Sequence, residues 1–323
     1  MIAVLFKRRL SLLLAAAALV AWGGFGLWQG LHTGFSGGLY DPGYRVPGVR
    51  PASPAATAGF QPGDRIVSVA GKPVEQLGME SRWPRSLAPQ PGQSHRFVVE
   101  RGGQRVNIDF VYPAPSRAAV DNRIRSALIG LGFLLFGLWG FFTAGTPAAL
   151  ALLHTGLCAG VSMATGLGPN LGSWNGLQGH LSTAAAALLF LLLLRFFLLF
   201  PEPKPLAASR LLWGSLYGLW AAFLAFLAAE LITHPAFYYT TGSVAYPLML
   251  LYCLLILAAI VHTLARSPRP VLRRSGLLWL LGAILIALAG ALSNRFPGWT
   301  SALPVLLIPF ALALAVRNQA RSA

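Results

Sequence analysis

Charged residues are scarce in this chain, because acidic and basic residues together make up only 11% of its 323 residues. Apolar residues make up 55% and the mean hydropathy is +0.62, values that exclude an ordinary soluble protein. The net charge of +16 is spread over many loops, without the cluster of basic and aromatic residues that favours nucleic acid. This composition predicts a multi-pass membrane protein with the lipid bilayer as a partner and no nucleic-acid partner.

Cysteine and the common protease motifs are also lacking. The two cysteines, Cys158 and Cys253, lie inside apolar runs, which excludes a disulfide framework and a cysteine-ligated zinc site. No H-E-x-x-H is present, the pattern that places two zinc-binding imidazoles and a general base on one helix face. Gly172-Ser173 and Gly242-Ser243 fall in expected loops and have no placed base. We therefore expect no enzyme activity, no metal and no cofactor.

The stretch from Val49 to Val74 carries the most specific pattern. Ser53 is suited to cap a short helix that begins at Pro54, and Gly59 is suited to end it in the left-handed conformation. A tight turn then precedes a β-branched strand over 66–69, and a second turn follows the strand. The motif residues are Ser53, Pro54, Gly59, Gly63, Asp64 and Gly71.

In this order the motif resembles the PDZ domain of bacterial envelope proteins, in the permuted form found in envelope serine proteases and site-2 zinc proteases. The family pattern is Ser-Pro-Ala, three residues, Gly, an apolar residue, two residues, Gly-Asp, a strand and Gly-Lys-Pro-Val. Nearly all of it is present over 26 residues. Ala70 is a departure, because an Asn often begins the second turn. The resemblance implies a small α+β domain that binds peptides.

Three regions follow from the composition along the chain. Residues 1–33 are expected to form a cytoplasmic tip and a transmembrane helix, and residues 34–117 an external PDZ-like β-barrel with helices. Residues 118–323 are expected to form an all-α bundle of about seven transmembrane helices with a cytoplasmic C-terminus. Within the external domain, Gly102-Gly103 predicts a type I′ hairpin, and a second helix is expected over 75–87.

The resemblance also implies where a ligand binds. A peptide or protein terminus would lie between the strand near 45–49 and the helix around 80–87, adding a strand to the sheet. Backbone amides of the glycine-containing loop before this strand would hold a terminal carboxylate. The expected peptide-binding residues are Gly37, Gly38, Leu39, Tyr40, Arg45, Pro47, Val49, Trp83 and Leu87.

Eight apolar runs are long enough, or nearly long enough, to cross a bilayer. The first, from about Leu10 to Leu31, follows Lys7, Arg8 and Arg9, which predicts an uncleaved helix with a cytoplasmic N-terminus. Basic residues in the later loops favour two cytoplasmic termini and a PDZ-like domain outside a bacterial inner membrane. The other runs cover about 124–144, 148–166, 181–200, 211–232, 246–264, 277–292 and 302–316.

Small residues recur one turn apart in several runs, a pattern that lets transmembrane helices approach closely. This pattern predicts a compact bundle and disfavours a wide aqueous pore. The sets are Gly26/Gly30, Gly156/Gly160/Ala164, Gly214/Gly218/Ala222 and Ala283/Ala287/Ala291.

Two ionisable residues lie at the edge of one apolar run. Glu230 is close to the outer end of its expected helix and four residues before His234, so the two would share a helix face. Ionisable groups at membrane depth are functional candidates, and this pair is a candidate membrane-sensing site. The alternative is that Glu230 is a solvated or paired boundary residue, for example with Arg295.

The order of one span, an external PDZ-like domain and about seven spans is similar to the input half of certain bacterial sensor histidine kinases, including competence-signal kinases. The run R-F-F-L-L-F-P-E-P-K-P, from Arg195 to Pro205, looks like the Phe-rich helix end of such modules. The chain departs from them after Val316, where no phosphorylated-His helix and no nucleotide-binding domain follow. Kinase activity is therefore not implied.

Three hypotheses for function remain open. In the first, the external domain binds a peptide or protein terminus and passes this signal to a separate kinase or regulator. In the second, the chain is a scaffold or accessory subunit of an envelope protease or assembly machine. In the third, it is a transporter or membrane enzyme with a site near Glu230 and His234. A pull-down separates the first two, and transport or turnover by the purified protein tests the third.

Overall fold

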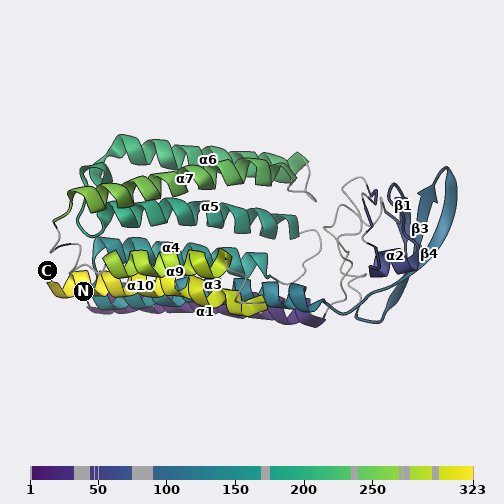
Figure 1. The fold of residues 1–323 in the computed structure, drawn as a ribbon, viewed down its shortest axis with the longest axis horizontal. Helices are drawn as coiled ribbons and strands as arrows, with labels where there is room; N and C mark the ends of the chain where they lie inside the picture. Colours follow the sequence, from purple (N-terminus) through teal and green to yellow (C-terminus); the bar gives the residue numbers. More distant parts are fainter. Residues whose placement is uncertain are drawn as a thin grey trace.

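A computed structural model describes residues 2–32, 44–46, 48, 49, 51–74, 90–168, 175–233, 239–268, 271, 277–292 and 298–322. Long helices form a bundle, and a small antiparallel sheet lies beyond one end of it (Figure 1). The N-terminus, at the start of α1, and the C-terminus, at the end of α10, both lie at the end of the bundle away from the sheet (Figure 1). The architecture is therefore mostly helical, with the sheet and the chain termini separated by the length of the bundle.

The sheet contains β1 (Arg65–Val69), β2 (Lys72–Pro73), β3 (Ser94–Arg101) and β4 (Gln104–Val111), in the order β2-β1-β3-β4 with antiparallel pairing throughout. Gly102 and Gly103 join β3 to β4 with φ of 57° and 80°. Positive φ at both central residues is the geometry of a type I′ turn, so the predicted hairpin is confirmed. The expected barrel is not shown, because in the described residues the sheet keeps two edge strands, whereas a closed barrel has none.

Alternating residues of β3 and β4 fill the core beneath this sheet. Phe97 and Phe110 are at most 1% exposed, and both contact the ring of Phe60 edge to face, with centroids 5.3 and 5.9 Å away. Edge-to-face contacts suit the ring quadrupoles and add to the burial of apolar area. The short helix α2 (Pro54–Ala58) ends just before Phe60. The sequence motif therefore places an aromatic residue at the centre of this core.

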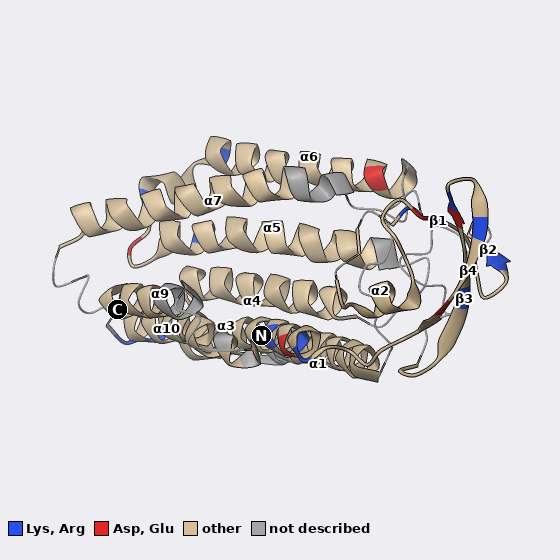
Figure 2. Ribbon diagram, turned by 45° about the vertical axis from the view of Figure 1, so that its right-hand side comes forward, with Lys and Arg blue, Asp and Glu red and all other residues tan. Residues whose placement is uncertain are grey.

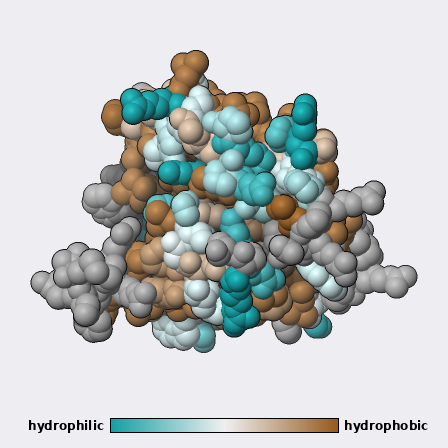
Figure 3. Space-filling view, turned by 90° about the vertical axis from the view of Figure 1, so that its left-hand side faces the viewer, coloured by the Kyte–Doolittle hydropathy of each residue, from teal (hydrophilic) through white to brown (hydrophobic). Residues whose placement is uncertain are grey.

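The bundle consists of eight apolar helices in the described part of the chain. Seven of them are long and apolar enough to cross a membrane, whereas α9 has 16 residues. Figure 2 shows long stretches of these helices without charged residues, as a hydrocarbon environment requires. Figure 3 looks onto the end of the bundle away from the sheet, where hydrophilic residues gather between apolar ones. The helices are α1 (Ile2–His32), α3 (Arg117–Ala144), α4 (Pro147–Gly166), α5 (Asn175–Leu199), α6 (Arg210–Thr233), α7 (Tyr239–Arg266), α9 (Leu277–Leu292) and α10 (Ala302–Ser322).

Glycines set the separation of the central helices. A Cβ on Gly156 of α4 would lie 2.5 Å from the carbonyl oxygen of Phe133 in α3, and Gly137 of α3 faces Gly156. Gly26 of α1 similarly lies against the backbone at the end of α4. These contacts confirm that small residues allow close packing at these positions.

The glycines of α6 behave differently. No atom lies within 4 Å of a Cβ built on Gly214 or Gly218, and both residues are exposed. The prediction that this set supports close packing within the chain is therefore wrong. Periodicity identifies a smooth helix face but does not tell whether another helix of the same chain covers it.

The two glycine environments predict opposite results for the same substitution. Gly156→Ala should destabilise the bundle by about 1–3 kcal/mol, because the added methyl meets backbone that cannot rotate away. Gly214→Ala should leave stability unchanged or raise it slightly, because alanine favours the helix and meets open space. Thermal unfolding of the two purified variants in the same detergent measures the difference. Equal melting temperatures would contradict the helix packing described here.

Candidate functional site

The short helix α2 of the candidate peptide-binding domain is fixed at both ends by the residues that flank it. The Ser53 hydroxyl accepts a hydrogen bond of 3.2 Å from the Ala56 N–H and caps this helix, which begins with Pro54. Gly59 ends the helix with φ of 94° in the left-handed region, as the sequence predicts. Its N–H donates to the Ala56 carbonyl at 3.0 Å. Local residue chemistry therefore sets both ends of α2.

The carboxylate of Asp64 connects this helix end to the sheet. It is 1% exposed and accepts hydrogen bonds of 2.7 Å from both Nε and Nη2 of Arg101, and one of 2.8 Å from the Gln61 N–H. The Arg101 Nη2 also donates to the Gly59 carbonyl at 2.7 Å. Arg101 was not predicted from the sequence. The need for such a partner could have been inferred from Asp64, because a buried carboxylate requires a charged or hydrogen-bonding partner.

This arrangement determines how Asp64 titrates. Burial acts to raise the pKa of the carboxyl, but the hydrogen bonds from Arg101 and Gln61 and the charge of Arg101 outweigh it and lower the pKa. A carboxyl whose pKa is lower in the folded state than in the unfolded state stabilises the folded domain. This contribution is fully present at pH values above the unfolded-state pKa of about 3.9. That contribution is lost as the pH falls through the folded pKa. The domain therefore keeps this interaction at all pH values above the acid range.

The segment before the motif lies beside β1. The Tyr44 carbonyl accepts from the Ile66 N–H and the Val46 N–H donates to the Asp64 carbonyl, both at 2.8 Å. Arg45 lies opposite Arg65 in an antiparallel bridge, and Val49 packs against the buried core. Two of the expected peptide-binding residues, Arg45 and Val49, thus lie in one stretch at the border of the sheet.

The remaining expected peptide-binding residues lie outside the described residues, as does the second helix expected over 75–87. The six motif residues are all described. Gly63 and Gly71 have φ of 90° and 77° at the two turns that flank β1, which fits their predicted turn roles. The residues outside the description are Gly37, Gly38, Leu39, Tyr40, Pro47, Trp83 and Leu87.

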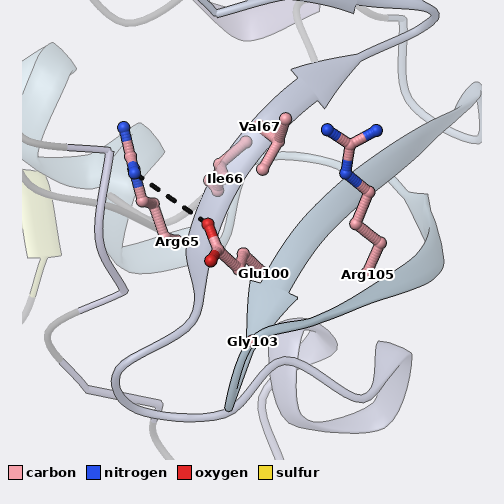
Figure 4. Close-up of a pocket in the computed structure, with 6 residues that line it drawn as sticks. All are labelled: Arg65, Ile66, Val67, Glu100, Gly103 and Arg105. Atoms are coloured by element: carbon pink, nitrogen blue, oxygen red, sulfur yellow. Dashed lines mark ion pairs between the residues drawn. The ribbon is translucent and has the colours of Figure 1, made fainter.

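A shallow pocket of about 270 Å³ lies on the β1–β3–β4 surface (Figure 4). Arg65 and Glu100 line it as an ion pair of 3.9 Å, and Arg105 stands apart on the other side of the pocket (Figure 4). Exposed pairs of this length contribute little to stability. The pocket includes none of the expected peptide-binding residues, so it does not mark the groove predicted from the sequence.

In the bundle, Glu230 pairs with a histidine that the sequence had not suggested. It is 6% exposed, and its Oε2 lies 3.5 Å from Nε2 of His180 in α5. His234 and Arg295, the two residues named with it by the sequence, lie outside the described residues. His180 was missed because it is fifty positions away in the sequence. The sequence feature that could have identified His180 is an ionisable side chain inside an apolar helix.

The buried ion pair predicts that two arginine substitutions have different effects on the stability of the domain. Arg101→Met should destabilise the domain by about 3 kcal/mol, because the Asp64 carboxylate stays buried without its charged partner. Arg96→Met is the matched control, since the Arg96–Asp109 pair is 64% and 62% exposed and should change the melting temperature little. Thermal unfolding followed by fluorescence of the full-length protein compares the two. Equal effects would contradict a structural role for the buried pair.

Comparison with known proteins identifies the sheet-containing region. The PDZ domain family matches residues 45–101. A protein of Brucella suis named "Putative zinc metalloprotease" is 37% identical over 87 residues, which are 27% of this chain and 22% of that protein. A protein of the same name from Mesorhizobium japonicum is 38% identical over 80 residues, 24% of this chain and 21% of that protein. The chain thus spans about a fifth of the length of these curated relatives. No solved structure matches it significantly.

These relatives correct two expectations. The expectation that the chain is not an enzyme is contradicted, because the matching proteins carry the name of a zinc metalloprotease. It rested on a missing H-E-x-x-H, and a short motif missing from a chain that matches only part of its relatives is weak grounds for excluding an activity. The resemblance to sensor kinases also finds no support among them. What is established is a PDZ domain within a protein of many apolar helices.

Proposed function

We propose that this chain acts in proteolysis at a bacterial membrane, where its PDZ domain binds an extended segment or terminus of the polypeptide to be processed. The observation that carries the proposal is a PDZ domain joined to a bundle of membrane-spanning helices. The names of the relatives support the link to proteolysis. This function develops the protease-subunit hypothesis and replaces the signal-input hypothesis.

Peptide binding would occur by addition of a strand beside the segment from Arg45 to Val49. The start of that segment already lies along β1, because the Tyr44 carbonyl and the Val46 N–H make backbone hydrogen bonds of 2.8 Å to Ile66 and Asp64. Strand addition gains backbone hydrogen bonds of about 0.5–1.5 kcal/mol net each, which supports binding on the order of micromolar. Backbone amides of the loop over 37–40 would hold a terminal carboxylate, and the helix expected over 75–87 would form the other side of the groove.

The position of the domain suits this role. In the proposed orientation both termini are cytoplasmic and the PDZ domain lies outside the inner membrane. The sheet lies beyond the end of the bundle opposite the termini (Figure 1), an arrangement compatible with that orientation. A bound polypeptide would therefore be held next to the bilayer surface, where membrane-anchored substrates emerge.

Peptide titration tests the proposal with full-length protein in lipid nanodiscs. Labelled peptides from a library of free carboxyl termini should bind with micromolar affinity, and amidated copies should bind less tightly because they lack the terminal charge. Gly59→Val should abolish binding, because its φ of 94° is strained for a β-branched residue. Gly59→Asn is the matched control and should retain binding, since asparagine tolerates this conformation and a Cβ there meets open space. Absence of binding by all peptides to the wild-type protein would refute the proposed function.

A further inference from the structure

Two arginine side chains at the end of the bundle away from the sheet lie over tryptophan rings. The Cζ of Arg195 in α5 is 5.7 Å from the ring centroid of Trp213 in α6. The Cζ of Arg317 in α10 is likewise 5.7 Å from the ring centroid of Trp139 in α3. At this distance a guanidinium is attracted by the negative face of an indole ring. The helices α3, α5 and α10 end at this end of the bundle and α6 begins there (Figure 1), so neither pair takes part in peptide binding.

Both arginines lie inside apolar spans. Arg195 belongs to the span Leu177–Leu199, and Arg317 belongs to the span Ala302–Arg321. Four residues separate Arg195 from the end of α5, which is about 6 Å along the helix axis. A charged group at this depth is costly unless water or an anion is within reach. Among the described residues, no carboxylate forms an ion pair with either guanidinium. The anions that a bilayer offers at this level are the phosphates of its lipid headgroups.

The ring of Trp213 is oriented by a hydrogen bond of its own. Its Nε1 donates to the Ala207 carbonyl at 2.9 Å, which ties the indole to the short helix η3 (Pro205–Ala208). The ring covers one face of the Arg195 guanidinium, and Arg195 remains exposed. The N–H groups of a guanidinium point outward in its plane, so stacking on a ring leaves them able to donate. Trp213 therefore positions the guanidinium without using its donors.

The surroundings of this pair are basic and apolar. Arg210 begins α6 one turn before Trp213 and is exposed, and positions three apart are neighbours on a helix surface. Leu206 and Leu211 are 57% and 83% exposed. Such apolar side chains suit the boundary between headgroups and acyl chains, where tryptophan is also enriched. Glu202 is the one acidic side chain described at this end of the bundle, and the described basic ones are Arg195, Lys204, Arg210, Arg266, Arg317 and Arg321.

Two of these basic residues differ from Arg195 in their contacts. The Lys204 Nζ donates to the carbonyls of Phe197 and Phe200 at 2.6 and 3.0 Å, so it caps the end of α5. Arg266 is the last residue of α7 and is exposed, and in the described part of the chain no tryptophan ring lies over it. Arg266 therefore has the same charge at the same end of the bundle without the stacked geometry.

We propose that Arg195, Trp213 and Arg210 form a binding site for the phosphate of an anionic phospholipid, in the leaflet at the end of the bundle away from the sheet. The exposed edge of the Arg195 guanidinium donates to two phosphate oxygens, an arrangement that a planar guanidinium matches and an ammonium does not. Trp213 is a positioning residue, and Arg210 adds a second positive charge. The Arg317–Trp139 pair repeats the arrangement on the side of the bundle formed by α3 and α10, away from α6 (Figures 1 and 2).

Native mass spectrometry of the full-length protein in detergent tests the site. Phosphatidylglycerol and phosphatidylcholine with identical acyl chains are titrated separately. The wild type should bind phosphatidylglycerol more tightly, because this lipid lacks the choline cation that the arginines repel. Arg195→Gln should weaken phosphatidylglycerol binding about fivefold, the contribution of one basic residue near a membrane surface. Arg266→Gln removes the same charge and should leave the affinity nearly unchanged.

Substitution of the ring tests the positioning role. Trp213→Leu keeps an apolar side chain and should lower the ratio of phosphatidylglycerol to phosphatidylcholine affinity, which loss of packing alone would not change. Equal losses in Arg195→Gln and Arg266→Gln would overturn the proposal, as would displacement of the bound lipid by inorganic phosphate, which would identify a site for the free anion. Equal affinities of the wild type for the two lipids would also overturn it, and that comparison decides even if a variant fails to fold.

Discussion

The buried ion pair of Asp64 and Arg101 is the interaction on which the PDZ domain depends. It joins the turn before β1 to the last residue of β3, and through the Gly59 carbonyl it also holds the end of α2. Each of these elements is too short to be stable alone. The buried carboxylate and its arginine bring the turn, the end of β3 and the end of α2 together. The three hydrogen bonds to the carboxylate form only when these elements are correctly placed. The extended segment at Arg45 is aligned by the same turn, because Val46 donates to the Asp64 carbonyl.

A second constraint governs the helices. Without water to separate polar from apolar faces, close approach of backbones provides much of the packing between membrane helices. Glycines supply that approach between α3 and α4 and between α1 and α4. In α6, Gly214 and Gly218 are exposed, and large apolar side chains such as Leu216, Phe223 and Leu227 pack this helix against its neighbours instead. The central helices thus approach each other closely through glycines, whereas α6 packs through larger side chains.

Local features were the ones that the sequence predicted. The cap at Ser53, the left-handed Gly59 and the Gly102-Gly103 hairpin each depend on neighbouring residues, and all three are present. Ala70 departs from the family pattern, and its φ of 50° explains why asparagine, which tolerates this conformation, is common there.

Long-range pairs could not be predicted in the same way. Arg101 is 37 residues from Asp64, and no sequence periodicity distinguishes it from the other arginines of the domain. His180 and Glu230 meet only because α5 and α6 pack side by side, which depends on the whole bundle. The functional expectation failed for a related reason. It relied on a missing catalytic motif, whereas the matching relatives carry the name of a zinc metalloprotease.

The central claim is that the PDZ domain contributes to proteolysis by binding polypeptides at the membrane. Turnover of envelope proteins in the native organism tests it most directly. Protein half-lives are measured by pulsed isotope labelling in cells with the wild-type chain, with no chain, and with Gly59→Val expressed at the wild-type level. The account predicts that a defined set of envelope polypeptides becomes longer-lived without the chain, and that the same set is stabilised by Gly59→Val. Unchanged half-lives in both strains would contradict it.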